Sequence, residues 1–180
     1  MIQIYIFHGD DETGRDRQKM AEATEKKIIG YLGERYAVDP AAVHIRKTDR
    51  GMPYIEGIPD LYISRSYCSG YAVYALGQIP VGIDIEEVRP YNRFLAVQFY
   101  SPSELQNLTS EKWTRLWTVK EAYAKYRETG LSCLRNFDLP IEELVENEGL
   151  KMKDIRIDRK HICSLVAETD TITTTYDTFV

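Results

Sequence analysis

The sequence predicts an α+β fold in which two similar α/β halves, residues 1–79 and 80–180, pack as a pseudo-dimer. Short segments of alternating apolar and polar residues, typical of strands, are separated by stretches with helical spacing. The order strand, helix, strand pair occurs twice along the chain. Its 180 residues, 43% hydrophobic and 28% charged, suffice for one domain or two small halves without disulfides or a structural metal.

The first half begins with a predicted strand at residues 2–7, where isoleucines alternate with their neighbours. A helix is expected at about 12–31, because apolar residues recur among charges, and Gly30 and Gly33 are expected to end it. The remaining predicted elements of this half are a strand at 43–45, turns at 51–53 and 59–60, and paired strands at 61–64 and 71–76.

The second half begins with a predicted strand at residues 81–86. The segment Ser101–Glu104 resembles a helix start, with Pro at the first helical position and an early acid. Residues 110–127 form the strongest helix prediction, because aromatic and aliphatic residues recur at helical spacing. The other predicted elements are a short helix at 94–99 and strands at 155–157, 161–166 and 172–176.

Charge and cysteine content exclude several functional classes. The 23 Lys and Arg against 28 Asp and Glu give a net charge of −5, which argues against nucleic acid as a partner. The three widely spaced cysteines match neither a disulfide framework nor a zinc site. Neither a secretory signal nor a membrane span is expected, since the apolar runs are too short. We therefore expect a cytoplasmic protein without a membrane partner.

Two carboxylates lie close together on the strand that opens the second half. Asp84 and Glu86 are two residues apart, so they point to the same face at a spacing of roughly 6–7 Å. Carboxylates this close repel unless a cation or hydrogen-bond donors lie between them. Gly82 on the same face leaves room beside them. The alternative for this segment alone is an edge strand with a solvated acidic face.

The strongest predicted helix supplies a third carboxylate. Glu121 and Lys125 are four residues apart and share one helix face, which alone could be an ordinary surface pair. Together with Asp84 and Glu86, Glu121 would give three oxygen ligands of the kind that Mg²⁺ prefers, with phosphate oxygens completing its shell. Lys125 would lie beside that metal, within reach of a phosphate. This combination suits phosphoryl-type transfer.

These two segments resemble the signature of the 4′-phosphopantetheinyl transferase superfamily. VGID at 81–84 is followed, 37 residues after its Asp, by Glu121 within WTVKEAYAK at 117–125. The family has (V/I)G(I/V)D, a spacer of roughly forty residues, and W/F-S/T-x-K-E-A/S-x-x-K. Upstream, GMPY at 51–54 and LYISRS at 61–66 are similar to the family's G-K-P and N-[IL]-S-H-S stretches.

The resemblance implies a reaction, a fold and a cofactor. The family transfers 4′-phosphopantetheine from coenzyme A to a serine of an apo acyl or peptidyl carrier protein, with Mg²⁺ (Mn²⁺ being an alternative), and releases 3′,5′-ADP. It implies metal binding by Asp84, Glu86 and Glu121. Lys125 would contact the pyrophosphate, and Glu121 or a metal-bound water would be the base. Two-half members, of the surfactin-synthetase-activating type, have the site in the cleft between their halves, so we expect a monomer.

The resemblance also implies a coenzyme A-binding side in the first half. The residues expected to bind coenzyme A are Arg50, Met52, Ser64, Arg65, Lys120 and Lys125. Two of them depart from the family pattern. Arg65 replaces a His that helps to hold the 3′-phosphate, and Arg can do the same with a forked donor set. Met52 replaces a common Lys, which removes a nucleotide contact.

A surface for the carrier is expected just after the acidic strand. Family carriers present their serine at the start of an acidic helix, which a positively charged surface would attract. Arg89, Arg93 and Phe94 combine positive charge with an apolar side chain. Two alternatives to an active transferase follow from the same residues. One is a catalytically weak transferase-like module that binds nucleotide or carrier; the other is a Mg²⁺-dependent phosphohydrolase, which needs the carboxylates alone.

Overall fold

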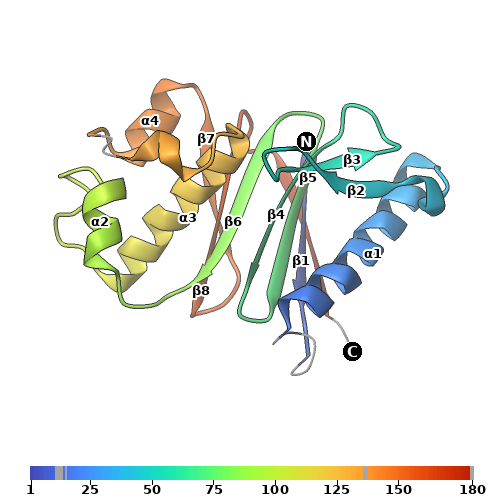
Figure 1. The fold of residues 1–180 in the computed structure, drawn as a ribbon, viewed down its shortest axis with the longest axis horizontal. Coiled ribbons are helices and arrows are strands. Elements are labelled where there is room, and N and C mark those ends of the chain that lie inside the picture. The colour runs from blue at the N-terminus through green and yellow to red at the C-terminus, as the bar shows by residue number, and fades with distance from the viewer. Residues whose placement is uncertain (11–13, 15, 136–137, 179–180) are drawn as a thin grey trace. The chain divides into compact units, whose positions relative to one another are not determined.

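The computed structural model describes residues 1–10, 14, 16–135 and 138–178, which form two compact units of mixed α/β structure (Figure 1). Unit 1 consists of Met1–Pro80 and the C-terminal strand, and unit 2 is Val81–Asp170. The α+β class predicted from the sequence is therefore confirmed. The division differs from the predicted halves in that the last strand pairs with the first. Within the described ranges, every helix is too short or too polar to cross a membrane.

Unit 1 contains a four-stranded sheet in the order β4-β5-β1-β9. Its strands are β1 (Ile2–His8), β4 (Tyr62–Cys68), β5 (Tyr71–Gly77) and β9 (Ile172–Thr178). The predicted hairpin of β4 and β5 is confirmed, and β1 runs antiparallel to β5 but parallel to β9. A short helical turn, η1 (Pro40–Ala42), precedes a second hairpin formed by β2 (His44–Lys47) and β3 (Pro53–Glu56).

The core of unit 1 lies between this sheet and α1 (Arg17–Tyr36). Asp16 caps the helix by accepting hydrogen bonds from the backbone of its first turn, so the helix begins at Arg17. Residues 12, 13 and 15 of the predicted helix lie outside the described residues. The expected stop at Gly30 and Gly33 is wrong, since both residues lie inside the helix. A Cβ on Gly33 would lie 2.7 Å from Pro40 Cγ, so this glycine serves close packing rather than helix termination.

Unit 2 contains an antiparallel sheet in the order β6-β8-β7, crossed by the long helix α3. Its elements are β6 (Val81–Glu87), α2 (Arg93–Phe99), α3 (Ser110–Tyr126), η2 (Leu131–Leu134), α4 (Ile141–Asn147), β7 (Lys151–Arg156) and β8 (His161–Ala167). Val119 and Ala122 of α3 pack against Val166 of β8 in a fully buried core. The predicted helices at 94–99 and 110–127 are confirmed within one residue at each end.

Two features of unit 2 differ from the sequence prediction. The segment Ser101–Glu104 forms turns rather than the start of a helix. Its apparent N-terminal acid, Glu104, turns inward and accepts a hydrogen bond of 2.7 Å from the backbone N–H of Ser101. The helix α4 was not predicted.

Candidate functional site

The acidic strand β6 presents one face to the helix α3. In its pairing with β8, Asp84 lies opposite Ser164, and the hydroxyl of Ser164 is 2.8 Å from that of Thr118 on α3. Gly82 and Glu86 share this face, because side chains alternate along a strand. Asp84 is only 4% exposed and Glu86 is partly buried. The solvated acidic edge considered as an alternative is therefore wrong for Asp84.

Gly82 sets the distance between β6 and α3. A Cβ at this position would lie 1.8 Å from the carbonyl oxygen of Ala122 and 2.7 Å from the backbone nitrogen of Tyr126. No side chain can occupy this space without a backbone shift. The helix backbone thus fills the room that the sequence suggested would lie beside the carboxylates, and the close approach brings Glu121 and Lys125 to Asp84.

We expect Gly82→Ala to destabilise unit 2 by about 2–3 kcal/mol, because the added methyl forces α3 away from the sheet. Chemical denaturation followed by circular dichroism would measure this change. Gly30→Ala is the matched control, since a Cβ there meets no atom within 4 Å. If Gly82→Ala has the same unfolding free energy as wild type, α3 can move away from β6 at little cost, which would contradict the expected effect.

Lys125 reaches from α3 to the acidic strand. Its Nζ donates to Asp84 Oδ1 at 2.6 Å and to the main-chain oxygen of Ile83 at 3.0 Å. The side chain of Lys125 is 21% exposed and that of Asp84 is 5% exposed, so the pair is largely shielded from water. The surface-pair alternative for Glu121 and Lys125 is wrong, because the lysine binds the strand.

The three carboxylates influence one another. Burial raises the pKa of Glu121 and of Glu86, and the negative charge of Asp84 raises both further. Lys125 acts in the opposite direction on both groups, and Arg89, whose guanidinium is 2.9 Å from Glu86 Oε2, lowers the pKa of Glu86. The site therefore concentrates negative charge in a poorly hydrated place, where a cation would be stabilised.

The donor set suits a hard divalent cation. Asp84, Glu86 and Glu121 offer only carboxylate oxygens, which Mg²⁺ and Mn²⁺ prefer to the nitrogen and sulfur ligands of softer metals. Within the described residues, no three acidic, His or Cys side chains are already gathered in metal-binding geometry. Lys125 holds Asp84 in the arrangement observed, so the side chains would have to rearrange to bind a metal.

A groove opens beside Glu86, and neither Asp84 nor Glu121 belongs to its described lining. It has a volume of about 390 Å³ and begins at Glu86. Leu95 of α2 and Trp113 and Trp117 of α3 form part of its wall, and the two indole rings stack with centroids 5.5 Å apart. The groove thus offers an extended ligand a partly apolar surface next to a charged centre.

Lys120 lies beneath the site rather than in it. Its Nζ is 2.9 and 3.0 Å from the two carboxylate oxygens of Glu104, and both side chains are almost completely buried. Glu104 also accepts hydrogen bonds from the backbone N–H groups of Ser101 and Ile141. Burial lowers the pKa of Lys120, while Glu104 opposes this shift. The sequence analysis missed Glu104, because nothing in its neighbourhood shows that Lys120, sixteen residues later, is its partner.

The residues of unit 1 predicted to bind coenzyme A lie on two hairpins. Arg50 is exposed and Met52 partly buried in the turn between β2 and β3. Ser64 is buried on β4. The neighbouring Arg65 forms an ion pair with Glu25 of α1, and only 14% of its side chain is exposed. Glu25 was not predicted, since the two residues are forty positions apart.

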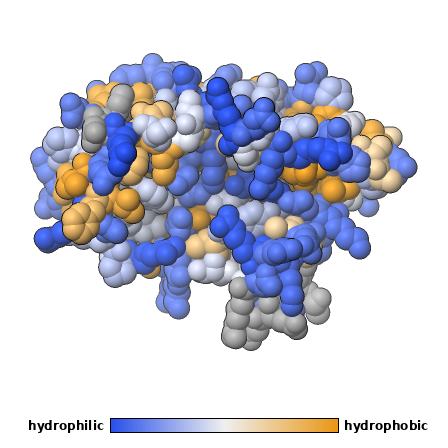
Figure 2. All heavy atoms as spheres, in the orientation of Figure 1, coloured by the Kyte–Doolittle hydropathy of each residue, from blue (hydrophilic) through white to orange (hydrophobic). Residues whose placement is uncertain are grey.

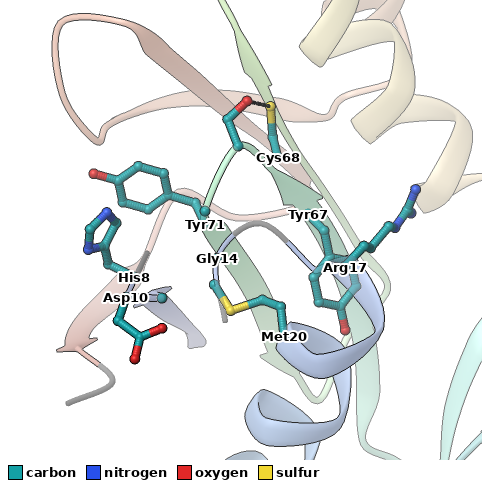
Figure 3. Close-up of a pocket in the computed structure, with 11 residues that line it drawn as sticks. His8, Asp10, Gly14, Arg17, Met20, Tyr67, Cys68 and Tyr71 are labelled. Atoms are coloured by element: carbon teal, nitrogen blue, oxygen red, sulfur yellow. Dashed lines mark hydrogen bonds between the residues drawn. The ribbon is translucent and has the colours of Figure 1, made fainter. Parts of the chain in front are cut away.

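Unit 1 also contains a cavity of about 620 Å³. Figure 3 shows its lining at the end of β1, the first turns of α1 and the tip of the β4–β5 hairpin. The ring centroids of His8 and Tyr71 are 4.7 Å apart, and the guanidinium of Arg17 lies 5.7 Å from the ring centroid of Tyr67. The described lining includes none of the residues predicted to bind metal, coenzyme A or carrier.

The predicted carrier surface contains an exposed apolar patch. Figure 2 shows hydrophobic side chains gathered over α2, and here Phe94 is 80% and Val97 is 66% exposed. Arg93 is exposed beside them at the first position of the helix. Arg89 differs from Arg93, because it binds Glu86 and so belongs to the carboxylate site as well.

Comparison with known proteins gives a consistent result. The model of the 4′-phosphopantetheinyl transferase superfamily matches residues 80–175, which is more than half of the chain. This match includes the complete acidic strand and the helix with Glu121 and Lys125.

Three bacterial proteins are among its relatives. A 4′-phosphopantetheinyl transferase of Bacillus subtilis is 33% identical over 124 residues, which are 62% of this chain and 55% of the relative. The 4′-phosphopantetheinyl transferase psf-1 of Bacillus pumilus is 33% identical over 115 residues, 60% of this chain and 49% of the relative. The 4′-phosphopantetheinyl transferase Sfp of Bacillus subtilis strain 168 is 27% identical over 112 residues, 58% of this chain and 50% of the relative. The chain spans about half the length of these relatives.

Proposed function

The chain belongs to the 4′-phosphopantetheinyl transferase superfamily, and from this premise we propose that it modifies acyl or peptidyl carrier proteins with the phosphopantetheine of coenzyme A. The observation that carries the proposal is the contact between Lys125 of the signature helix and Asp84 of the acidic strand. This contact joins residues 41 positions apart and unites the two motifs in one charged centre.

The proposed reaction is a phosphoryl-type transfer. The serine oxygen of the carrier forms a bond to the β-phosphorus of coenzyme A, and the bond between that phosphorus and the bridging oxygen of the pyrophosphate breaks. The bridging oxygen leaves with 3′,5′-ADP, and the proton of the serine hydroxyl passes to a base. Catalysis of such transfers rests on positioning and on stabilising the charge of the phosphates.

Asp84, Glu86 and Glu121 are the proposed ligands of Mg²⁺, with Mn²⁺ as an alternative. The bound ion would neutralise charge on the pyrophosphate. Lys125, which already reaches this place, would donate to a phosphate oxygen. Glu121 or a metal-bound water is the proposed base for the incoming serine. Lys120 supports the site through Glu104.

Arg50, Met52, Ser64 and Arg65 remain the proposed coenzyme A-binding residues of unit 1. We expect Arg65→Ala to weaken the binding of coenzyme A about fivefold to tenfold, and to weaken the binding of 3′-dephospho-coenzyme A much less. A charge-assisted bond to the 3′-phosphate would contribute roughly 1.5–3 kcal/mol, part of which is offset by breaking the pair with Glu25. Calorimetric titration of both ligands tests this expectation. Arg46→Ala, which removes another ion-paired arginine of unit 1, is the control. Equal losses for both ligands would contradict a 3′-phosphate contact.

Arg93 and Phe94 are the proposed docking residues for the carrier, with Arg89 at the border of the catalytic centre. We expect the double variant Arg93→Glu with Phe94→Ala to raise the KM for carrier about tenfold at low salt, because it removes attraction and apolar contact. The electrostatic part of the effect should shrink as salt is added, and the KM for coenzyme A should not change. Arg89 is left intact, since its loss would also disturb Glu86. Lys153→Glu on β7 is the control, and an equal effect there would argue against a specific docking surface.

We further propose that the two units correspond to the two similar halves of pseudo-dimeric family members, and that the protein is a monomer. A cytoplasmic location is proposed as well, where coenzyme A and reduced cysteines are found. Analytical ultracentrifugation tests the monomer, and a sedimenting dimer would refute it.

The decisive test incubates the purified protein with coenzyme A, Mg²⁺ and a panel of apo carrier proteins. A gain in carrier mass equal to one phosphopantetheine, with release of 3′,5′-ADP, is the expected result. Release of phosphate products without carrier modification would indicate a hydrolase instead. Binding of coenzyme A or carrier without any product would indicate a module that has lost turnover.

A further inference from the structure

The carboxylate centre of unit 2 already holds a cation, which is the ammonium group of Lys125. This group is 2.6 Å from Asp84 Oδ1 and 3.0 Å from the main-chain oxygen of Ile83. Its side chain is largely shielded, as is that of Asp84. Lys125 therefore offsets the charge of the most deeply buried carboxylate of the proposed metal site.

Lys125 and a divalent ion compete for the same place. A metal bound to Asp84 Oδ1 at about 2.1 Å would lie less than about 5 Å from an ammonium group that stays on the same oxygen. Two cations at this distance repel strongly where water is scarce. A metal that takes Asp84 Oδ1 would therefore displace the lysine from that oxygen.

We propose that Lys125 is a built-in counter-ion of the carboxylate centre, which metal binding displaces from Asp84 and thereby releases to bind phosphate. This inference rests on the proposed function for the metal and the phosphate that it names. It gives Lys125 opposite effects on the binding of the metal and on the binding of the pyrophosphate. The lysine weakens metal binding in the absence of coenzyme A, yet it contributes to binding of the pyrophosphate once the metal is present.

The displacement links the two ligands. The metal must break the bond between Lys125 and Asp84 when it binds alone, and this loss is recovered only when a phosphate takes the released lysine. Metal and coenzyme A should then favour each other's binding, since coupling between two sites is reciprocal. The protein would thus hold little metal until its substrate arrives.

The test measures Mn²⁺ binding to the full chain without coenzyme A, by electron paramagnetic resonance of the free ion. Lys125→Met should bind Mn²⁺ about tenfold more tightly than wild type, within the range usual for coupled sites. Lys125→Arg keeps the positive charge and should bind Mn²⁺ as wild type does. Lys112→Met, which removes a lysine from the first turn of the same helix, should also leave the affinity unchanged. Equal or weaker binding by Lys125→Met would overturn the inference.

A second measurement needs no variant at Lys125, in case the substitution prevents folding. Acetylation of Lys125 in wild type, followed by mass spectrometry of its peptide, should become faster when Mn²⁺ is added, because the displaced amine is more exposed. A slower or unchanged rate would overturn the inference. If wild type modifies the carrier and Lys125→Met has unchanged Mn²⁺ affinity, the counter-ion role of Lys125 is refuted and the transferase function stands. Tighter Mn²⁺ binding in Lys125→Met without carrier modification by wild type would uphold the counter-ion and refute the transferase.

Discussion

Asp84→Asn should lower the rate of carrier modification by at least about a hundredfold, a loss of the size seen when one charge-stabilising group is removed from an active centre. The amide keeps the shape of the carboxylate but removes its charge, so it binds a divalent ion poorly. It also releases Lys125 from its ion pair. Rates are measured by carrier mass at saturating Mg²⁺ and coenzyme A.

The fold of Asp84→Asn should remain intact, with a change in unfolding free energy of at most about 1 kcal/mol. The asparagine can still accept a hydrogen bond from Lys125. Unlike the enclosed Lys120, Lys125 is 21% exposed, still donates to the main-chain oxygen of Ile83 and keeps the charges of Glu86 and Glu121 nearby. Glu143→Gln is the control, because it removes an exposed carboxylate from α4, outside the described lining of the groove. Near-normal turnover of Asp84→Asn would remove Asp84 from the metal site.

The sequence was most informative where chemistry depends on residues close in the chain. The spacing of Asp84 and Glu86 placed both on one strand face, and that of Glu121 and Lys125 placed both on one helix face. The structure brings Asp84 and Lys125 into direct contact. Local periodicity could not supply this contact, which depends on the close approach of α3 to β6 at Gly82.

The sequence was least informative where a polar side chain has a distant partner. The sequence predicts Glu104 as an early acid of a helix, whereas in the structure it is the buried partner of Lys120. Arg65 was expected to be available to a phosphate and is paired with Glu25. Both pairs depend on packing between elements, which neither composition nor spacing predicts. In the same way, β9 joins unit 1 through pairing with β1, a contact across most of the chain length.

Glu104→Gln should destabilise the protein by about 3–5 kcal/mol, the usual effect of leaving one charge of a buried pair without its partner. Lys120, whose Nζ lies 5.1 Å from the ring centroid of the buried Tyr100, would lose its counter-ion, and burial would lower its pKa further without the opposing charge of Glu104. The backbone N–H groups of Ser101 and Ile141 would also lose a charged acceptor. Urea unfolding followed by tryptophan fluorescence measures the change. A loss below about 1 kcal/mol would contradict the buried pair.

The double variant Glu104→Gln with Lys120→Met separates structure from catalysis. It should recover most of the stability, because no buried charge remains and the glutamine oxygen can still accept from the backbone N–H groups of Ser101 and Ile141. The recovered protein then permits a measurement that neither single variant allows. If Lys120 acts only by supporting α3, the KM for coenzyme A should equal that of wild type. The kcat should then fall only slightly, because the substitution shifts the neighbouring Glu121 a little. If Lys120 contacts coenzyme A, as the family resemblance implied, the KM should rise about tenfold or more despite the restored fold. The burial of Lys120 against Glu104 favours the first outcome, because the ammonium group is enclosed with its counter-ion and shielded from any ligand at the surface.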